Sequence, residues 1–291
     1  MYKILDGKKL ASEIKEEISE IISNLNNDDI PTLGILQVGD LAESNIYIRH
    51  KLGVAKEIGM RTILIKLEEN ANENQIISAI EDLKQKSDGF IIQLPMQTNQ
   101  INDVHKILDL IPKSQDIDGL TSANSDVDYQ LTDSFLPATA LGIIILLKHY
   151  NIPLVNQNIA VVGQSKIVGY PLSNYLQQLN NQVSRYDKFT PKDTIIKNDI
   201  VVVATGVRNS VSVKLIKKGA IVVDVGIHRI DNKIIGDVDF DAYKEVVSYI
   251  TPVPGGVGPM TVISLIINLI KSKIIRNPGL IDFFAKIKKY W

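Results

Sequence analysis

The chain has 291 residues, of which 45% are hydrophobic, 32 are basic and 33 are acidic, and it contains no cysteine. This length suits two domains of ordinary size, and the balanced charge gives no support for nucleic acid or an anionic membrane surface as a partner. The absence of cysteine excludes disulfides, thiolate metal sites and a cysteine nucleophile, and it is consistent with a reducing compartment.

The balanced charge favours a small molecule as the partner. Two further features favour a cytoplasmic protein. The amino-terminal segment MYKILDGKKLASEI lacks the apolar core and cleavage site of an export signal. The apolar runs at residues 141–147 and 262–270 are shorter than the ~20 residues that a membrane span requires. We therefore expect buried helices at both runs and no membrane partner.

Helix and strand patterns alternate along the first part of the chain. Residues 10–25 have apolar positions at helical spacing, and Asp6 supplies a helix-start signal. The same patterns predict strands at 32–38, 62–67 and 90–94, and helices at 44–58, 73–86 and 104–110. This alternation is typical of a parallel sheet covered by helices, so we expect an α/β domain.

A polar stretch without periodicity, residues 120–134, predicts a long loop, and we place a domain boundary near Leu136. A second alternation follows, with a helix at 140–150, strands at 159–162, 183–186, 200–204 and 221–225, and a helix that ends at 179. Residues 227–236 carry an Asp231-Asn232 turn and predict either a hairpin that could serve a dimer or a surface ribbon. The loop PVPGGVGP then precedes an apolar helix from 261 to 270.

Residues 159–171, IAVVGQSKIVGYP, join a buried strand to a helix through a loop that begins at Gly163 and ends at Gly169. Such a turn directs backbone N–H groups and the positive end of a helix dipole toward one point, which suits a phosphate group. Compared with the usual dinucleotide fingerprint, the spacing is one residue longer and Ser165 replaces the middle glycine. A dinucleotide site is indicated, and an ordinary strand-to-helix turn remains an alternative.

Several other residues could carry chemistry. Tyr47 and Lys51 share one face of a predicted helix, although a helical lysine is most often solvated. Gln93 follows an apolar strand, at the edge where parallel sheets place ligands. Asp116 and Asp118 in QDIDG could bind a metal, act as acid and base, or cap a turn. The three glycines of PVPGGVGP would let a ligand approach the main chain closely.

Taken together, these motifs resemble the bifunctional methylenetetrahydrofolate dehydrogenase/methenyltetrahydrofolate cyclohydrolase family over nearly the whole chain. The motifs that carry the resemblance are VGDLAESNIYIRHK, DGFIIQLPMQ, DIDG, GQSKIVGYP, DVGI and YITPVPGGVGPMT. The resemblance implies a folate-binding catalytic domain at 1–138, joined by the returning helix 262–291, and a Rossmann domain with a doubly wound parallel sheet at 139–261. A folate cleft would lie between them, and the protein would be a homodimer.

The resemblance also implies an enzyme with two activities in one-carbon metabolism. The first is NADP-dependent oxidation of 5,10-methylenetetrahydrofolate, and the second is hydrolysis of the methenyl product to 10-formyltetrahydrofolate. No metal is implied, because the methenyl carbon is already electrophilic. The alternatives are a monofunctional NAD-dependent dehydrogenase and a non-catalytic nucleotide- or folate-binding relative.

By position in the motifs, the resemblance implies that Lys51 assists hydration of the methenyl carbon, that Tyr47 orients the folate and that Gln93 holds Lys51. Asp118 would bind the pterin ring. The implied substrate-binding set is Tyr47, Lys51, Gln93, Leu94, Pro95, Asp118, Pro254, Gly255 and Gly256. The implied cofactor-binding set is Thr139, Gly163, Gln164, Ser165, Ile167, Val168, Lys188, Ala204, Thr205, Gly206, Gly226, Ile227, Gly258 and Thr261.

Two departures from the family pattern bear on chemistry. Gly53 stands where relatives commonly have a second lysine, and Gln164 stands where many have an arginine that meets the 2′-phosphate of NADP. Asp187 favours the free ribose of NAD, whereas Lys188 and the nearby Arg185 favour NADP. We expect NADP, with NAD as the alternative.

Overall fold

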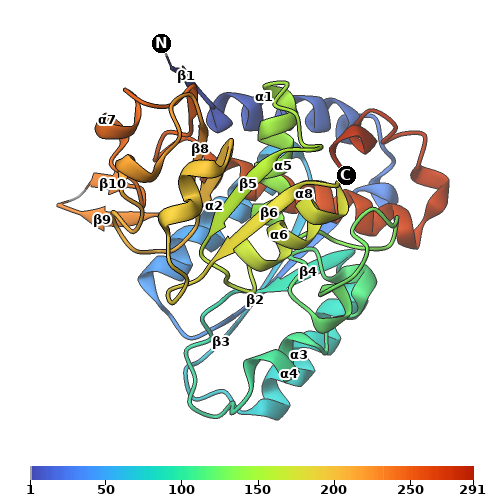
Figure 1. The fold of residues 1–291 in the computed structure, drawn as a ribbon. Helices are drawn as coiled ribbons and strands as arrows, with labels where there is room; N and C mark the ends of the chain where they lie inside the picture. Colours follow the sequence, from blue (N-terminus) through green and yellow to red (C-terminus); the bar gives the residue numbers. More distant parts are fainter. Residues whose placement is uncertain (1, 232) are drawn as a thin grey trace. The chain divides into compact units, whose positions relative to one another are not determined.

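The computed structural model describes residues 2–231 and 233–291 of the chain. Contacts between residues divide the chain into two compact units. Figure 1 labels the helices and strands of both. The first unit comprises Glu13–Ala138 and Val262–Trp291, and the second comprises Met1–Ser12 and Thr139–Thr261. Each unit therefore combines segments that are far apart in the sequence.

A parallel sheet in the order β3-β2-β4 forms the centre of the first unit within the described residues. Every residue of the central strand β2 is buried, which explains its continuous apolar sequence. The core of this unit lies between the sheet and α3, where Leu36, Ile80 and Phe90 are fully buried. The elements are β2 (Thr32–Val38), α2 (Ala42–Ile58), β3 (Arg61–Leu67), α3 (Glu73–Lys86), β4 (Gly89–Ile92) and α4 (Val104–Leu108).

The helix α8 (Val257–Arg276) begins within the segment that the sequence predicts as a loop up to Pro259. The first N–H groups of a helix have no partner inside it, so a proline in the first turn is tolerated. By length and composition this helix could cross a membrane, but 72% of its apolar window is buried inside the protein. This burial agrees with the buried helix that the sequence predicts. However, α8 ends at Arg276, so the expected helix 262–291 is too long, and only short 3-10 turns at Pro278–Leu280 and Ile287–Tyr290 follow it.

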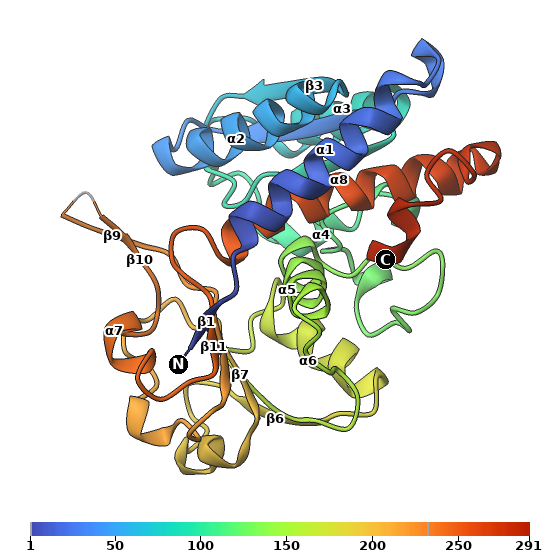
Figure 2. The ribbon, with the colours of Figure 1, turned by 90° about the horizontal axis from the view of Figure 1, so that it is seen from above.

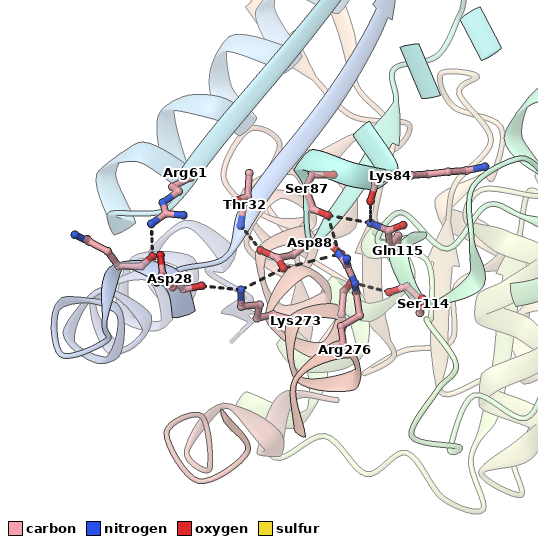
Figure 3. A network of polar contacts seen from close by, with 12 residues as sticks. Asp28, Thr32, Arg61, Lys84, Ser87, Asp88, Ser114, Gln115, Lys273 and Arg276 are labelled. Carbon is pink, nitrogen blue, oxygen red and sulfur yellow. Dashed lines mark hydrogen bonds and ion pairs between the residues drawn. The ribbon is translucent and has the colours of Figure 1, made fainter. Parts of the chain in front are cut away.

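Polar contacts around Asp88 attach the carboxyl-terminal part of α8 to the sheet of the first unit (Figure 3). The Thr32 N–H donates to Asp88 Oδ2 at 2.8 Å and joins the start of β2 to the residue before β4. From α8, Lys273 Nζ lies 3.3 Å from Asp88 Oδ1, and Arg276 donates to the Ser87 carbonyl at 2.7 Å. These contacts lie at the edge of the sheet where the strands begin. The opposite edge, where the strands end, is therefore the one at which functional residues are expected.

In the described part of the second unit, a parallel sheet has the order β1-β11-β8-β7-β5-β6. Val162, Val203 and Val222 are fully buried in its core. The helices are α5 (Ala138–His149), α6 (Gly169–Gln178) and α7 (Phe240–Tyr243). The strands are β1 (Lys3–Ile4), β5 (Asn158–Val162), β6 (Gln182–Tyr186), β7 (Ile200–Val203), β8 (Ile221–Asp224) and β11 (Tyr249–Ile250).

The strand order reverses between β5 and β7, because β6 lies on one side of β5 while β7 and β8 lie on the other. Open α/β sheets bind ligands at such a reversal, outside the carboxyl ends of the strands. The loops after β5 and β7 are in close contact there, since a Cβ atom on Gly163 would lie 2.1 Å from the Ala204 carbonyl oxygen. The α/β class with a parallel sheet is confirmed.

The sequence pattern does not predict β1, which pairs in parallel with β11. The Leu5 N–H also donates to the Ile250 carbonyl at 2.9 Å. Residues 1–12, which the sequence assigns to the first domain, therefore group with residues 139–261. The helix α1 (Gly7–Ser23) follows, and the Lys9 N–H donates to Asp6 Oδ1 at 2.9 Å, as expected from the start signal at Asp6.

Residues 227–236 contain an antiparallel hairpin of β9 (His228–Ile230) and β10 (Lys233–Ile235). It projects away from the sheet of the second unit (Figure 2). Asp231, in its turn, has a φ of 47°, the left-handed conformation that aspartate tolerates. Asn232, the other residue of the predicted turn, lies outside the described residues.

Candidate functional site

In the first unit, the Lys51 ammonium group donates a hydrogen bond of 3.1 Å to Gln93 Oε1. Lys51 comes from α2 and Gln93 directly follows β4. The Gln93 amide N–H in turn donates to the Leu94 carbonyl at 2.8 Å, which directs its oxygen toward Lys51. The two residues meet because α2 and β4 both contact β2.

Asp118 completes this cluster. Burial lowers the pKa of Lys51, and the negative charge of Asp118 raises it in part. Burial also raises the pKa of Asp118, while the Lys51 charge lowers it and the nearby Asp116 raises it. An amine whose pKa is lowered by burial is partly neutral at a lower pH than an ordinary lysine, so it can exchange protons with a bound ligand or water.

Asp116 has a different role from Asp118, although the sequence left both open as metal ligands, acid and base, or turn caps. Asp116 is buried, and its carboxylate accepts hydrogen bonds from the N–H groups of Gly119 at 3.0 Å and Thr121 at 2.9 Å. The Asn124 amide also donates to it at 2.9 Å. Asp116 therefore caps the turn that presents Asp118.

A buried side chain on α8 supports the same turn. Asn268 donates one amide hydrogen to the Ile117 carbonyl at 2.9 Å and the other to the Leu136 carbonyl at 3.1 Å. Ile117 immediately precedes Asp118, so this contact fixes the backbone from which Asp118 projects. Asn268 is not predictable from the sequence, because nothing in the helical pattern distinguishes an asparagine that binds backbone carbonyls from any other polar position.

The remaining predicted folate contacts in the first unit are more exposed. Tyr47 lies one helical turn before Lys51, and its side chain is 44% exposed. Leu94 and Pro95 follow Gln93, and Pro95 is exposed. These residues lie beside the Lys51 cluster in the chain and are accessible to a ligand.

In the second unit, the glycine-rich loop connects β5 to α6. Gly163 has a φ of 95°, and a Cβ atom on Gly169 would lie 1.8 Å from the Gly163 carbonyl oxygen, so the loop folds tightly onto itself. Ser165 and Ile167 are exposed at its tip, and Val168 precedes the first residue of α6. The loop thus places exposed backbone at the start of a helix, beside the reversal of strand order, as a nucleotide phosphate requires.

The Gln164 side chain points back into this loop. Its amide N–H group donates to the Val161 carbonyl at 2.9 Å and to the Gly163 carbonyl at 3.3 Å. The Gln164 side chain therefore stabilises the turn itself.

After the end of β6, the Asp187 carboxylate is hydrogen-bonded within its own loop, whereas the Lys188 ammonium group is exposed. Asp187 Oδ1 accepts hydrogen bonds from the N–H groups of Phe189 at 2.9 Å and Thr190 at 2.8 Å, and from the Thr190 hydroxyl. Lys188 is exposed, and its Nζ atom lies 4.8 Å from the centre of the Phe189 ring. Arg185 donates to Asn174 at 2.7 Å and so contacts α6.

The predicted contacts after β7 and β8 are joined by a carboxylate, Asp237, that is not among the residues predicted from the sequence. Asp237 Oδ2 accepts hydrogen bonds from the N–H groups of Thr205 at 2.8 Å and Gly206 at 3.0 Å. A Cβ atom on Gly226 would lie 1.9 Å from Asp237 Oδ1. The sequence signal was a glycine near each of two aspartates: Gly226 follows Asp224 by two residues in DVG, and Gly236 directly precedes Asp237 in GD.

Residues 254–259 belong to the second unit and include the first three residues of α8. Gly255 has a φ of 108°, and its carbonyl accepts a hydrogen bond of 2.8 Å from the Lys8 N–H. Gly258 lies near Ile227, whose Cδ1 atom would be 3.9 Å from a Cβ at that position. Thr261 donates to the Thr139 hydroxyl at 3.2 Å. Pro254 is exposed and Gly256 is buried.

Over residues 2–231 and 233–291, no group of three or more histidine, aspartate or glutamate side chains is arranged to hold a metal ion.

The comparisons with known proteins agree with this arrangement. The model of the tetrahydrofolate dehydrogenase/cyclohydrolase catalytic domain matches residues 5–118, and the model of the NAD(P)-binding domain of the same family matches residues 137–276. A bifunctional protein FolD from Metamycoplasma arthritidis is 47% identical over 291 residues, which cover 100% of this chain and 99% of the relative. The chain belongs to the tetrahydrofolate dehydrogenase/cyclohydrolase family.

Solved structures support the same assignment. The bifunctional FolD enzyme from Campylobacter jejuni has a TM-score of 0.89 and 36% identity, covering 95% of this chain and 100% of that one. The FolD enzyme from Trypanosoma brucei, solved with NADP and an inhibitor, has a TM-score of 0.87 and 28% identity, covering 94% of this chain and 98% of that one. The family resemblance of the sequence motifs is confirmed, and this family member is an enzyme with an NAD(P)-binding domain.

Proposed function

We propose that the protein oxidises 5,10-methylenetetrahydrofolate with NADP and hydrolyses the 5,10-methenyl product to 10-formyltetrahydrofolate. The observation that carries this proposal is the Lys51–Gln93–Asp118 cluster of the first unit. In the first reaction the methylene carbon loses a hydride to the cofactor. In the second reaction water adds to the methenyl carbon, the bond from that carbon to N5 breaks, and a proton is released.

The cluster supports the hydrolytic step. The methenyl carbon is already electrophilic, so the protein has mainly to place a water molecule and move protons, and the step is written without a metal ion. Neutral Lys51 accepts a proton from the attacking water, and Gln93 holds the amine in position. Asp118 accepts hydrogen bonds from the donor edge of the pterin ring.

The second unit supports the oxidative step. The tight glycine loop before α6 fits the cofactor's diphosphate, and the loops after β7 and β8 lie at the same edge of the sheet. When bound, NAD(P) supplies the hydride acceptor.

We propose NADP rather than NAD as the cofactor. Asp187 Oδ1 accepts three hydrogen bonds from its own loop, which weakens the case for a carboxylate that binds a ribose hydroxyl. Lys188 is exposed in the same loop and offers a cation to a 2′-phosphate. The substitution Lys188→Ala is expected to raise KM for NADP about tenfold, since one charge-assisted hydrogen bond is lost, and to leave KM for NAD unchanged. An equal change for both cofactors would contradict this assignment, and Lys197→Ala, an exposed lysine further along the chain, is the control.

The bifunctional assignment has a direct test. Lys51→Met is expected to lower the hydrolysis of methenyltetrahydrofolate by about 10³-fold, because the proton acceptor is lost. NADP binding, measured by calorimetry, should not change. Lys56→Met alters an exposed lysine of the same helix and should behave as the native enzyme.

The outcomes separate the alternatives. Hydrolysis that survives Lys51→Met would remove Lys51 from the mechanism. A native protein that reduces NAD alone and shows no hydrolysis would be the monofunctional dehydrogenase. A protein that binds ligands and catalyses neither step would be a non-catalytic relative.

We also propose that the protein is a cytoplasmic homodimer. The support for a dimer is the exposed apolar pair Ile230 and Ile234 on the projecting hairpin, and the support for a reducing compartment is the composition without cysteine. Light scattering after size-exclusion chromatography tests the dimer, and cell fractionation tests the cytoplasmic location.

A further inference from the structure

A fully buried carboxylate links two loops at the ligand-binding edge of the second unit. Asp237 is 0% exposed, and its Oδ2 atom accepts hydrogen bonds from the backbone of Thr205 and Gly206, which follow β7. The Thr205 hydroxyl donates to the same oxygen at 2.8 Å. The other oxygen, Oδ1, lies 2.8 Å from His228 Nε2. His228 is the first residue of β9 and directly follows Ile227.

The chain is built around these contacts. A Cβ atom on Gly226 would lie 1.9 Å from Asp237 Oδ1, and a Cβ atom on Gly236 would lie 1.8 Å from Asp224 Oδ2. Asp224 Oδ1 in turn accepts a hydrogen bond of 2.9 Å from the Asp237 N–H. Any side chain at either glycine would displace a carboxylate, so both glycines serve this arrangement.

His228 is the part of the arrangement that joins the loops. A carboxylate oxygen that receives this contact acts as the acceptor, so we assign to His228 the tautomer with the hydrogen on Nε2. Through Asp237, the imidazole connects the segment after β8, which contains Gly226 and Ile227, to the turn after β7. The β7 turn contacts the glycine loop after β5, because a Cβ atom on Gly163 would overlap the Ala204 carbonyl.

We propose that His228 is a positioning residue for the nicotinamide cofactor, which it serves through Asp237 without itself touching the reacting atoms. It holds the turn 204–207 and the segment 225–228 in the single arrangement that receives the cofactor at the reversal of strand order. This inference rests on the proposed function, because it assumes that this edge binds NADP.

The test compares two substitutions at one position. His228→Gln keeps an N–H donor near the place of Nε2, whereas His228→Leu removes the donor and leaves Asp237 Oδ1 without it. The Leu variant is expected to bind NADP about tenfold more weakly by calorimetry, with a matching rise in KM for NADP, while the Gln variant recovers most of the affinity. Lys233→Gln, on the exposed opposite strand of the hairpin, is the matched control.

If His228 positions the cofactor, hydrolysis of methenyltetrahydrofolate, assayed without cofactor, should keep its native rate in both His228 variants, because it depends on Lys51 in the first unit. A purely structural role would instead lower NADP binding and hydrolysis equally. Native NADP affinity in the Leu variant would overturn the inference, and so would equal losses of NADP binding and hydrolysis, or failure of the Gln variant to recover affinity. A native protein that does not bind NADP would instead overturn the proposed function.

Discussion

At the scale of single residues, the Lys51 ammonium group experiences two opposed influences. Burial lowers its pKa, and the charge of Asp118 raises that pKa again. The cluster therefore sets the fraction of neutral amine at a given pH, and that fraction limits a step in which Lys51 accepts a proton.

This balance predicts a pH effect on hydrolysis. The rate of the native enzyme should rise with pH until Lys51 is neutral, with a midpoint below the pKa of an ordinary lysine. In Asp118→Asn the attraction that favours the charged amine is lost, so the pKa of Lys51 falls further and the rising part of the profile moves to lower pH. Profiles of kcat against pH for the two enzymes measure the shift, and movement to higher pH would contradict it.

These residue roles were only partly accessible from the sequence. Spacing placed Tyr47 and Lys51 on one helical face. Because exposed lysines are common, a solvated lysine was favoured, and only the family resemblance singled out Lys51. The Lys51–Gln93 hydrogen bond depends on how two separate elements pack on β2, which local pattern does not encode. The orientation of Gln164 toward its own loop was inaccessible for the same reason.

At the scale of elements, α8 supports the first unit through buried polar side chains. Asn268 binds two backbone carbonyls, while Ser264, one turn earlier, is buried with no hydrogen-bond partner for its hydroxyl among the described residues. The two positions give a matched pair, because both are buried and polar and only one contacts the turn before Asp118.

Asn268→Leu is expected to destabilise the protein by about 3 kcal/mol, because two buried carbonyls lose their donor. It should also raise KM for the folate, because the backbone before Asp118 is released. Ser264→Ala should have little effect on either quantity, because no hydrogen bond is lost. Urea unfolding and steady-state kinetics measure both, and equal effects of the two substitutions would show that Asn268 acts only by packing.

Lys271, on the same helix, gives a second effect with a defined sign. Its Nζ atom donates to the Ser134 carbonyl at 2.5 Å, and burial lowers its pKa to about 8, while Asp133 raises it and Lys113 lowers it. Between this value and the usual pKa of 10.5, the unfolded chain binds more protons than the folded one, so stability rises with pH.

Relative to Lys271→Met, the native protein should therefore gain about 2 kcal/mol of unfolding free energy between pH 7 and pH 10. Urea unfolding of both proteins at the two pH values measures this difference. If the unfolding free energies of the native protein and Lys271→Met differ by the same amount at pH 7 and pH 10, Lys271 titrates as an ordinary exposed lysine.

The elements themselves were largely predictable from the sequence. The bounds predicted for β2 and α3 agree with the structure, because a buried central strand and an amphipathic helix each have a clear period. The start of α8 was placed too late, because Gly258 and Pro259 indicate a loop unless the tolerance of a first helical turn is considered. A strand of two residues such as β1 has no period to detect.

At the scale of the whole molecule, the division into units does not follow the order of the sequence. The amino-terminal strand β1 extends the sheet of the second unit, and Leu5, which follows it, is fully buried. The family's catalytic-domain model matches from residue 5, so the sequence alone assigns residues 5–12 to the first unit. Long-range strand pairing decides the assignment, and no local pattern records it.

This arrangement predicts that a substitution near the amino terminus weakens the cofactor-binding unit. Leu5→Ala should cost about 3 kcal/mol through the cavity it leaves, and the loss should appear as faster amide exchange in β11 and β8. The strand β2 of the first unit should keep its protection, whereas Leu33→Ala, a fully buried leucine of β2, should give the converse pattern. If both substitutions accelerated exchange equally in all three strands, the two units would unfold as one cooperative block, and the contribution of Leu5 would belong to the whole chain.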